Sequence, residues 1–489
     1  MSEVKKPKLR KFDTKVQLLR YKVLREVARH AYDDTLLESF NDIAKVIVKD
    51  KPTMRCCIYK ERAIVGERIK IATGGDRKNP NIIEVIDIAC DGCPEGGYEV
   101  TDDCRGCIAH RCEDVCKRGA ITFDEHQKAH IDKEKCVNCG MCAQVCPYTA
   151  IANRKRPCER ACKIKAISKD PETRAAKIDY NKCISCGACV YQCPFGAIDD
   201  KSFILRVIDY VKLREQNPEQ EVIAIVAPSI GSQFSYAKHG QVVAGIKKLG
   251  FSAVVEAALG ADIVSYSETK ELLEKGFLTS SCCPGFVSYI EKSMPKMADK
   301  ISHNLSPMGA IAKVLREKDE NAKIVFIGPC TAKKAEIMRD NVKHYVDAVI
   351  TFEELQALLD SRDIDITELD EENLDTATYF GRIFARSGGL TESVANAVNE
   401  LGISEDEFKF NPIVCSGIEE CRTALLKAQA GKLPNNFIEG MACVGGCIGG
   451  AGCLTHEAKD SRQIDAYGKE STVPTMMDAL ERIDYPVEK

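Results

Sequence analysis

The chain has 489 residues, and its 69 Lys and Arg against 73 Asp and Glu give a formal net charge of −4. This length suggests two to four domains, and the near balance of charge argues against a dedicated nucleic-acid binder, which shows a basic excess. No apolar stretch approaches the ~20 residues that span a bilayer, and the lysine-rich start lacks the apolar centre of an export signal. We therefore expect a cytoplasmic protein with neither a nucleic-acid nor a membrane partner.

Residues 1–89 are predicted to form a mostly helical N-terminal region. Apolar residues recur at helical spacing over 15–48, which predicts one or two amphipathic helices. Residues 54–59 instead favour a short strand. In a strand the adjacent Cys56 and Cys57 would point to opposite faces, so we expect one buried and one exposed thiol.

Cysteine is the unusual component of the composition. The chain has 26 cysteines, and sixteen of them lie between Cys90 and Cys193. In a long chain without an export signal, cysteines at this density indicate metal binding rather than disulfides. We assign residues 90–200 to a ferredoxin-like iron–sulfur domain with tandem repeats.

The repeats are visible in two segments, 135–151 and 182–198, which share four cysteines, a following proline and a closing Ala-Ile pair. Their spacing, C-x2-C-x2-C-x3-C-P, is the bacterial-ferredoxin run, in which the fourth cysteine ligates the other cluster of a pair. Two weaker copies, 112–121 and 158–167, keep only C-x3-C-x3-A-I. Two tandem pairs of units explain this spacing of the cysteines. Zinc is the alternative metal for C-x2-C pairs, but the proline-terminated runs favour iron–sulfur clusters.

Exchanging the fourth ligand within each pair predicts ligand sets for three accessory 4Fe–4S clusters. The sets are Cys104, Cys107 and Cys112 with Cys146; Cys136, Cys139 and Cys142 with Cys116; and Cys183, Cys186 and Cys189 with Cys162. Cys158 and Cys193 are left over, two ligands short of a cluster. Cys90 and Cys93 either complete a fourth cluster or are structural, and the spacing leaves both possibilities open.

From residue 201 onward the pattern changes twice. Residues 201–220 are predicted to be a linker with a helix over 202–214, and residues 221–489 form a C-terminal domain in which strands alternate with helices. The expected strands are 222–227, 253–256 and 323–327, and the expected helices are 237–249, 263–275 and 308–318. This alternation predicts an α/β domain with largely parallel sheets. The whole chain is therefore predicted to be a multidomain protein of mixed α+β and α/β class.

Three short segments of this domain carry cysteines: TSSCCPGF at 279–286, IGPCTAKKAE at 327–336 and EGMACVGGCIGG at 439–450. Because the segments are far apart in sequence, their cysteines can converge on one buried centre only in a folded domain. Together the segments resemble, in order and spacing, the three signature segments of the iron-only (FeFe) hydrogenases. The resemblance extends from residue 221 to about 456, and the upstream repeats suit the monomeric, ferredoxin-domain type of that family.

The resemblance implies a two-lobed C-terminal domain that holds an H-cluster. This cofactor is a 4Fe–4S cubane joined through one cysteine sulfur to a diiron unit with carbonyl, cyanide and bridging amine-dithiolate ligands. Carried over by position, the cubane ligands would be Cys283, Cys330, Cys443 and Cys447, with Cys447 as the bridging cysteine.

The same resemblance assigns residues around the diiron unit. Lys333 would donate a hydrogen bond to one cyanide, and Ala227, Pro228 and Ser229 would contact the other. Met441 would pack against the diiron unit. Without the resemblance, Lys333 would be interpreted as part of a charged helix surface.

A proton path is implied as well. Cys282 would exchange protons with the bridging amine, and Glu268, Ser302 and Glu271 would carry them outward. On their own, Glu268 and Glu271 would be interpreted as carboxylates on an exposed helix face.

Three positions depart from the usual family pattern. Phe286 stands where many relatives have Trp, Gly328 where many have Met, and Met308 where a polar amide is common. These changes resemble a less-studied branch, sometimes called group B. No family role applies to five further cysteines, Cys56, Cys57, Cys415, Cys421 and Cys453.

The function implied by the resemblance is reversible H2 oxidation and proton reduction. Electrons would pass through the accessory clusters to ferredoxin or a similar small carrier, dedicated maturation enzymes would supply the diiron unit, and the protein would be a monomer. Two alternatives remain. One is an H2-sensing regulatory protein of the same fold, and the other is a hydrogenase-like iron–sulfur assembly protein, which lacks the full diiron pocket.

Overall fold

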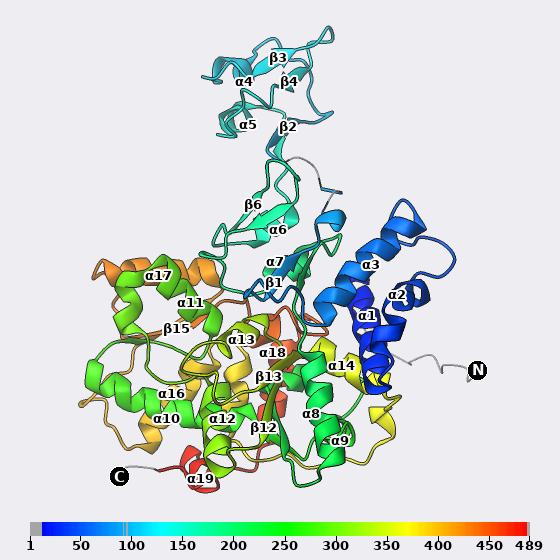
Figure 1. The fold of residues 1–489 in the computed structure, drawn as a ribbon. Coiled ribbons are helices and arrows are strands. Elements are labelled where there is room, and N and C mark those ends of the chain that lie inside the picture. The colour runs from blue at the N-terminus through cyan, green and yellow to red at the C-terminus, as the bar shows by residue number, and fades with distance from the viewer. Residues whose placement is uncertain (1–11, 91, 94–95, 487–489) are drawn as a thin grey trace.

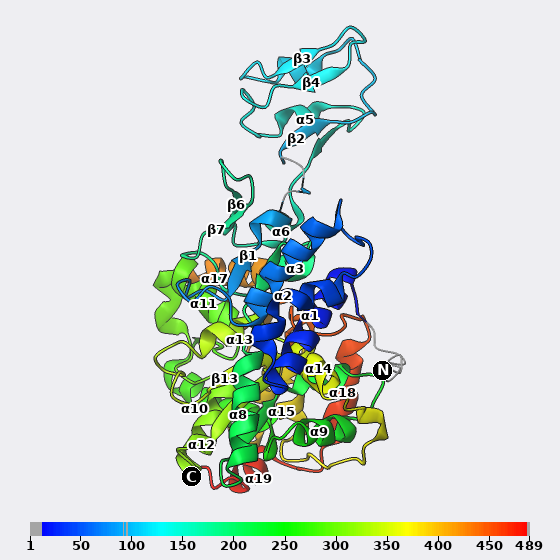
Figure 2. The same cartoon turned by 45° about the vertical axis from the view of Figure 1, so that its right-hand side comes forward.

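A computed structural model describes residues 12–90, 92–93 and 96–486. The lysine-rich start, residues 1–11, lies outside the described residues. Figures 1 and 2 show a large C-terminal body, three N-terminal helices packed against its side, and a cysteine-rich arm that projects away from both. No helix in the described part of the chain is long and apolar enough to cross a membrane.

The N-terminal region forms α1 (Lys15–Tyr32), α2 (Leu36–Ile47) and α3 (Ile58–Ala72). This confirms the helices expected over 15–48. Helix α1 begins after Thr14, whose side chain accepts the backbone N–H of Gln17, as a helix N-cap does.

The strand expected over residues 54–59 is wrong. Cys57 instead caps α3, because its sulfur accepts the backbone N–H of Lys60. The Glu61 carboxylate accepts the backbone N–H groups of Thr53 and Met54 and so folds the preceding loop back onto the helix. Cys56 and Cys57 are both exposed, so the expected buried thiol is absent at this pair.

The two ferredoxin-like units are nested rather than tandem. The inner unit consists of β2 (Tyr98–Val100) paired with β5 (Ile151–Asn153), and β3 (Ile121–Phe123) paired with β4 (Ala129–Ile131). The outer unit consists of β1 (Ile83–Val85) paired with β8 (Ile198–Asp200), and β6 (Ile167–Lys169) paired with β7 (Ala176–Ile178). The short helices between them are α4 (Arg111–Asp114), α5 (Met141–Val145), α6 (Pro157–Ala161) and α7 (Ala188–Gln192).

This nesting corrects the predicted tandem order. The inner unit is inserted after the first strand of the outer unit, between Cys93 and Cys158. The weaker repeat at 158–167 lacks an adjacent C-x2-C because its C-x2-C partner, Cys90 and Cys93, lies on the other side of the insertion. Figure 1 shows the inner unit as the tip of the projecting arm.

Helix α8 (Ile204–Gln216) leads from the outer unit into a domain with two parallel sheets. One sheet has the order β10 (Ala253–Glu256), β9 (Val222–Val226), β12 (Lys323–Gly328), β13 (Ala348–Thr351). The other has the order β11 (Leu278–Thr279), β15 (Phe437–Met441), β14 (Pro412–Ser416). The expected strands and the α/β class are confirmed. Every residue of β9 is buried, as expected for a strand covered on both faces.

Helices cover both sheets. They are α9 (His239–Lys248), α10 (Ala257–Lys275), α11 (Pro284–Ser293), α12 (Pro307–Lys318), α13 (Thr331–Glu336), α14 (Phe352–Ser361), α15 (Tyr379–Arg382), α16 (Gly389–Glu400), α17 (Ile418–Gln429), α18 (Asp460–Lys469) and α19 (Met476–Glu481). Helix α10 begins six residues before the expected 263 because its first turns are small, buried residues without an amphipathic pattern. A Cβ at Gly260 would lie 2.0 Å from the Pro307 carbonyl oxygen, so this glycine permits the close packing of α10 on α12.

A buried ion network joins three parts of the molecule. Arg20 of α1 pairs with Asp199 (2.7 Å) and Asp200 (2.5 Å) of β8 and with Glu353 (3.0 Å) of α14. Lys334 of α13 pairs with the same Asp200 (2.8 Å). The N-terminal helices, the outer ferredoxin-like unit and the C-terminal domain are therefore fixed against one another by charges that do not reach solvent.

Candidate metal centre

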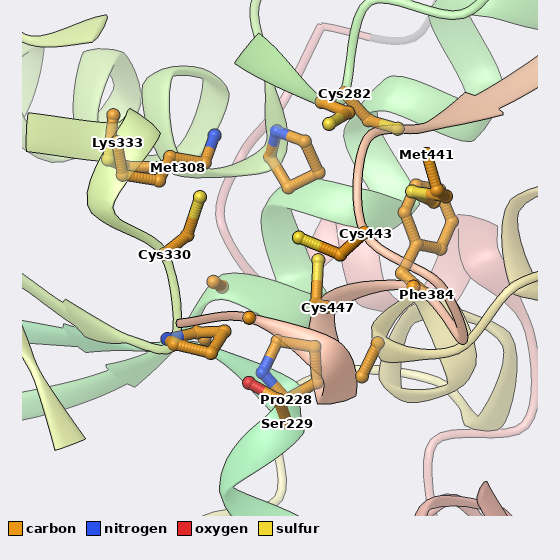
Figure 3. A pocket seen from close by; sticks show the side chains of 18 of the residues that line it. Pro228, Ser229, Cys282, Met308, Cys330, Lys333, Phe384, Met441, Cys443 and Cys447 are labelled. Atoms are coloured by element: carbon orange, nitrogen blue, oxygen red, sulfur yellow. The ribbon is translucent and has the colours of Figure 1, made fainter. Parts of the chain in front are cut away.

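Four cysteines converge on a cavity of about 80 Å³ in the C-terminal domain. Cys283 and Cys330 immediately precede α11 and α13, and Cys443 and Cys447 lie on the loop after β15. All four cysteines follow the carboxyl ends of three parallel strands, β11, β12 and β15, the usual place for a site in such sheets. Figure 3 shows the sulfurs of Cys330, Cys443 and Cys447 directed into this space.

The donor set suits a metal cluster. Burial and the neighbouring charges of Cys330 and Cys283 raise the pKa of Cys447 to about 12. Burial and the charge of Cys283 raise the pKa of Cys330 to about 11. Without a metal these groups would remain thiols at neutral pH, whereas bound metal holds cysteines as thiolates. Soft thiolate ligands select iron–sulfur clusters or zinc.

The cavity wall also fits a unit with hydrogen-bond-accepting ligands. Ser229 Oγ is fully buried and has no hydrogen-bond partner among the described residues. A buried polar atom without a partner points to a missing partner at that place. Lys333, 7% exposed, enters the same wall and donates to Ser306 Oγ at 2.6 Å. Its ammonium also pairs with Glu336 at 2.7 Å.

The rest of the wall is apolar. Ala227 and Pro228 lie beside Ser229, and the side chains of Met308 and Met441 line the cavity. Two of the departures noted above are accommodated here. A Cβ at Gly328 would lie 2.6 Å from the ring of Phe326, so this ring occupies the space next to the glycine. Met308 is 1% exposed and adds an apolar side chain to the cavity wall.

The predicted proton-path residues lie in a row, although among the described residues no hydrogen bond joins Glu268 to Ser302 and Glu268 Oε2 has no partner. Glu268 of α10 is fully buried and its Oε1 accepts the N–H (3.1 Å) and the hydroxyl (3.3 Å) of Ser281. Burial raises the pKa of Glu268 to about 7, and the hydrogen bonds from Ser281 act in the opposite direction. Ser302 in turn donates to Glu271 at 3.0 Å. The Glu271 side chain is 12% exposed, so the row ends near solvent.

Cys282 forms the inner end of this row. It lines the cavity, and burial followed by the charge of Glu268 raises its pKa well above the ordinary value. Glu268 is thus close enough to Cys282 to affect the pKa of the Cys282 thiol. Sequence reasoning missed Ser281 and Ser306, which bond to Glu268 and Lys333. The signal for Ser281 was its place next to Cys282.

The accessory cysteines lie near one another in four groups, three of which have the composition predicted from the spacing. One cavity is lined by Cys116, Cys136, Cys139 and Cys142, and another by Cys162, Cys183, Cys186 and Cys189. Cys104, Cys112 and Cys146 lie in one apolar cluster that also contains Cys116 and Cys142, and burial, with the charges of Cys107 and Cys146 as smaller causes, raises the pKa of Cys112.

The fourth group spans the insertion. Burial followed by the charge of Cys193 raises the pKa of Cys93, and Cys90 adds to this effect. Burial followed by the charge of Cys193 also raises the pKa of Cys158 to about 12. Cys90, Cys93, Cys158 and Cys193 are therefore neighbours in the folded chain.

The shared C-x3-C-x3-A-I pattern has a structural reason. The backbone N–H groups of Ala120, Ala166 and Ala197 donate to the sulfurs of Cys116 (3.3 Å), Cys162 (3.2 Å) and Cys193 (3.2 Å). Each of these sulfurs belongs to the last cysteine of its repeat. Hydrogen bonds to cluster sulfurs are one means by which a protein sets reduction potential.

Three of the remaining cysteines are buried and lie outside these groups. Cys421 donates to the Met441 carbonyl oxygen at 3.5 Å, and Cys453 donates to the Ile448 carbonyl oxygen at 3.4 Å. Cys415 is 1% exposed in β14. Cys421 and Cys453 hold the backbone next to the cavity.

Comparison with known families identifies the class. Residues 220–451 match the iron only hydrogenase large subunit, C-terminal domain; residues 103–150 match a 4Fe-4S dicluster domain and residues 176–199 a 4Fe-4S binding domain. The chain therefore contains an iron-only hydrogenase C-terminal domain preceded by ferredoxin-like 4Fe–4S domains. These matches favour iron–sulfur clusters over zinc in the repeats.

Individual relatives are of two kinds. Iron hydrogenase 1 of Clostridium pasteurianum is 27% identical over 53% of this chain and 54% of its own length, so the chain spans about half of that relative. The periplasmic [Fe] hydrogenase large subunit of Nitratidesulfovibrio vulgaris is 29% identical over 67% of this chain and 87% of its own. The cytosolic Fe-S cluster assembly factor narfl of Xenopus tropicalis is 24% identical over 51% and 66%.

Among solved structures, [FeFe]-hydrogenase HydA1 from Chlamydomonas reinhardtii aligns with a TM-score of 0.49 at 21% identity. It covers 57% of this chain and 93% of the other.

Proposed function

We propose that this protein is an FeFe hydrogenase that interconverts H2 with two protons and two electrons. The observation that carries the proposal is one cavity lined by four cysteines together with Lys333, the unpartnered Ser229 and Cys282, with the buried Glu268 nearby. A protein that only handled a cubane would need the thiolates alone. The relatedness to cluster assembly factors makes assembly the second candidate.

In this proposal the residues of the chain have different roles. Cys283, Cys330, Cys443 and Cys447 would hold the cubane of the H-cluster, with Cys447 bridging to the diiron unit. When bound, the H-cluster would supply an open iron position for H2 and a bridging amine as base.

Lys333 and Ser229 would donate hydrogen bonds to the two cyanides and thereby orient the diiron unit, while the apolar wall with Met441 keeps water out. Low polarity strengthens such hydrogen bonds.

Protons would travel along the row at the edge of the cavity. Cys282 would exchange a proton with the bridging amine and with Glu268. Ser302 would connect Glu268 to Glu271, from which solvent takes or gives the proton. A general acid/base works best with a pKa near the working pH, and Glu268 meets this condition.

Electrons would travel through four accessory 4Fe–4S clusters, including one held by Cys90, Cys93, Cys158 and Cys193. The projecting inner unit would hand them to ferredoxin or a similar small carrier. Whole-protein features such as the carrier, the monomeric state, a cytoplasmic location and the group B assignment remain predictions.

The direct test is maturation. Protein made without the dedicated maturation enzymes should contain cubanes only and be inactive. Adding a synthetic diiron precursor should produce infrared bands of carbonyl and cyanide ligands together with H2 evolution. If the loaded protein showed no such bands, the assembly role would be favoured instead.

Iron content tests the fourth cluster. The proposed set of clusters holds about 22 iron atoms, four for each of five cubanes and two in the diiron unit. Replacing Cys90 and Cys93 by Ser should lower this by about four. Replacing the exposed pair Cys56 and Cys57 by Ser should not change it, because they lie outside the four groups. An unchanged count in the first variant would make Cys90 and Cys93 structural.

The raised pKa of Glu268 predicts that both reaction rates depend on pH. Proton reduction needs Glu268 protonated, so at constant driving force it should rise as the pH falls through about 7. H2 oxidation needs the ionised carboxylate and should rise as the pH increases through the same value. Glu268→Gln should lower both rates and remove their change with pH around 7. Glu274→Gln, at an exposed position of the same helix, should leave the profile unchanged; a shared profile in both variants would exclude Glu268 as the titrating group.

A further inference from the structure

The turn after Cys116 carries two cations at the rim of an accessory cysteine group. Lys117 and Arg118 are the central residues of this turn, which the Gly119 N–H closes on the Cys116 carbonyl oxygen at 3.0 Å. Both residues are exposed, and neither forms an ion pair with a described residue. They line the same cavity as the group Cys116, Cys136, Cys139 and Cys142.

This cysteine group comes closest to the surface. Cys139 is exposed, whereas the other cysteines of the accessory groups are buried or partly buried. Val137 lies between Cys136 and Cys139, lines the same cavity and is 57% exposed. Figure 1 places the inner unit at the tip of the projecting arm, where a second protein can approach it.

A third cation adds to the positive charge of this rim. Lys133 is exposed and donates to the carbonyl oxygen of Tyr98, another residue of the cavity wall, at 2.6 Å. The acids nearest to it in sequence are Asp132 and Glu134, and Asp132 pairs with Lys135 at 3.4 Å. We call Lys117, Arg118 and Lys133 the basic rim; its three cations face one remaining acid of this segment, Glu134.

The other cysteine group of the inner unit has the opposite flanks. Asp102 and Asp103 precede its first cysteine, Glu113 and Asp114 follow its third, and all four acids are exposed. An exposed apolar residue, Ile108, is present there too, so an apolar side chain alone does not distinguish the two groups. The distinction lies in the sign of the charge and in the exposed Cys139.

We propose that the basic rim is the docking surface for a small electron carrier with an acidic face, and that electrons leave the chain from the group containing Cys139. This rests on the proposed function, which passes electrons through the inner unit to a carrier. Lys117 and Arg118 would pair with carboxylates of the carrier around an apolar contact at Val137. Interfaces commonly combine an apolar centre with a polar rim.

The transfer moves one electron from the reduced cluster to the oxidised carrier and moves no atom. Two carriers therefore take up the two electrons from one H2, and each has to leave before the next can dock. Charges at the rim of an interface act mainly on the association rate. A charged rim around a small apolar centre thus suits a contact that forms quickly and does not last.

The test is stopped-flow mixing of the reduced full chain, reconstituted with cubanes and lacking the diiron unit, with an oxidised bacterial ferredoxin that has an acidic surface. The second-order rate constant of electron transfer should fall as salt is added, because the Debye length shortens from about 10 Å at 0.1 M to about 3 Å at 1 M. In the double variant Lys117→Glu, Arg118→Glu it should fall at least about tenfold at low salt, the lower range for electrostatic steering.

Three further variants control this result. Lys117→Arg, Arg118→Lys keeps both charges and should match the parent. Lys117→Gln, Arg118→Gln should give an intermediate loss, and it replaces the charge reversal if that variant binds less iron than the parent. Arg105→Glu reverses an exposed cation beside the other cysteine group and should leave the rate constant within about twofold.

Three outcomes would overturn the proposal. An equal loss in Arg105→Glu would place the exchange at the other group. A rate constant that is unchanged in both Lys117 and Arg118 charge variants, or that rises with salt, would exclude docking of an acidic carrier at the basic rim. Self-association of the parent that the charge reversal abolishes, without a change in the rate constant, would assign the rim to a second copy of the chain. Failure of the proposed function would show separately, as matured protein without H2 turnover whose reduced cubanes still pass electrons to the ferredoxin.

Discussion

Cys282→Ala should assemble a complete H-cluster and yet lose at least about 100-fold in turnover, the lower range for a positioned acid/base group. Cys282 is adjacent to the ligand Cys283 and lines the cavity, so its sulfur is the group between the metal site and Glu268. Burial raises its pKa well above the ordinary value, so it stays a thiol that gives up a proton only as another base or acid completes the exchange. Alanine removes that step and leaves the ligand set intact.

Infrared spectra and turnover rates, measured on the same matured samples, separate these two effects. Cys415→Ala is the matched control because it removes another buried thiol that lies outside the row. We expect that variant to retain the parent's bands and most of its activity. Retention of more than half the activity by Cys282→Ala would mean that protons take another route, and the roles of Glu268, Ser302 and Glu271 would fall with it.

Lys333→Met should bind its cubanes normally and lose the diiron unit. The ammonium of Lys333 is the buried charged donor in the cavity wall, and hydrogen bonds to charged groups contribute about 1.5–3 kcal/mol. We therefore expect diiron retention to weaken by at least about tenfold, since 1.4 kcal/mol corresponds to a factor of ten. Diiron retention is measured as the infrared band intensity after loading with limiting precursor, normalised to cubane iron.

Removing Lys333 alone also leaves Glu336 as an unpaired buried carboxylate, which destabilises the site for a different reason. The double variant Lys333→Met, Glu336→Gln removes both charges and separates the two causes. Lys343→Met, at an exposed position, is the control for loss of a lysine. Parent-like band intensity in the double variant would show that Lys333 does not hold the diiron unit.

The fold of the C-terminal domain was predictable because its local signals are strong. The apolar run of β9 and the helices after it follow from residue pattern alone, since a strand buried on both faces must be apolar throughout. The start of α10 was not predictable in this way. Its first turns are buried on all sides, so no amphipathic period marks them.

The cysteine-rich arm shows the limit of spacing arguments. Spacing predicts which cysteines share a group, because cluster geometry restricts it, but it contains no information about strand pairing. Nesting depends on the pairing of β1 with β8 across the whole insertion. At Cys56 and Cys57, likewise, the helix cap formed with Lys60 outweighs a local preference for a strand.

The site was predictable where its residues belong to the three motifs. Partners outside these motifs, such as Ser306 beside Lys333, appear only in the folded chain. The space next to Gly328 is a similar case. The sequence shows only the departure at Gly328, whereas the structure shows the ring of Phe326 in the space next to it.

Protein-film voltammetry of the matured full chain tests the central claim most directly. We predict catalytic current in both directions, an oxidative current under H2 and a reductive current from protons, which are absent from the same chain lacking the diiron unit. Current limited to the reversible one-electron waves of the cubanes, in protein with full carbonyl and cyanide bands, would contradict the assignment as a hydrogenase.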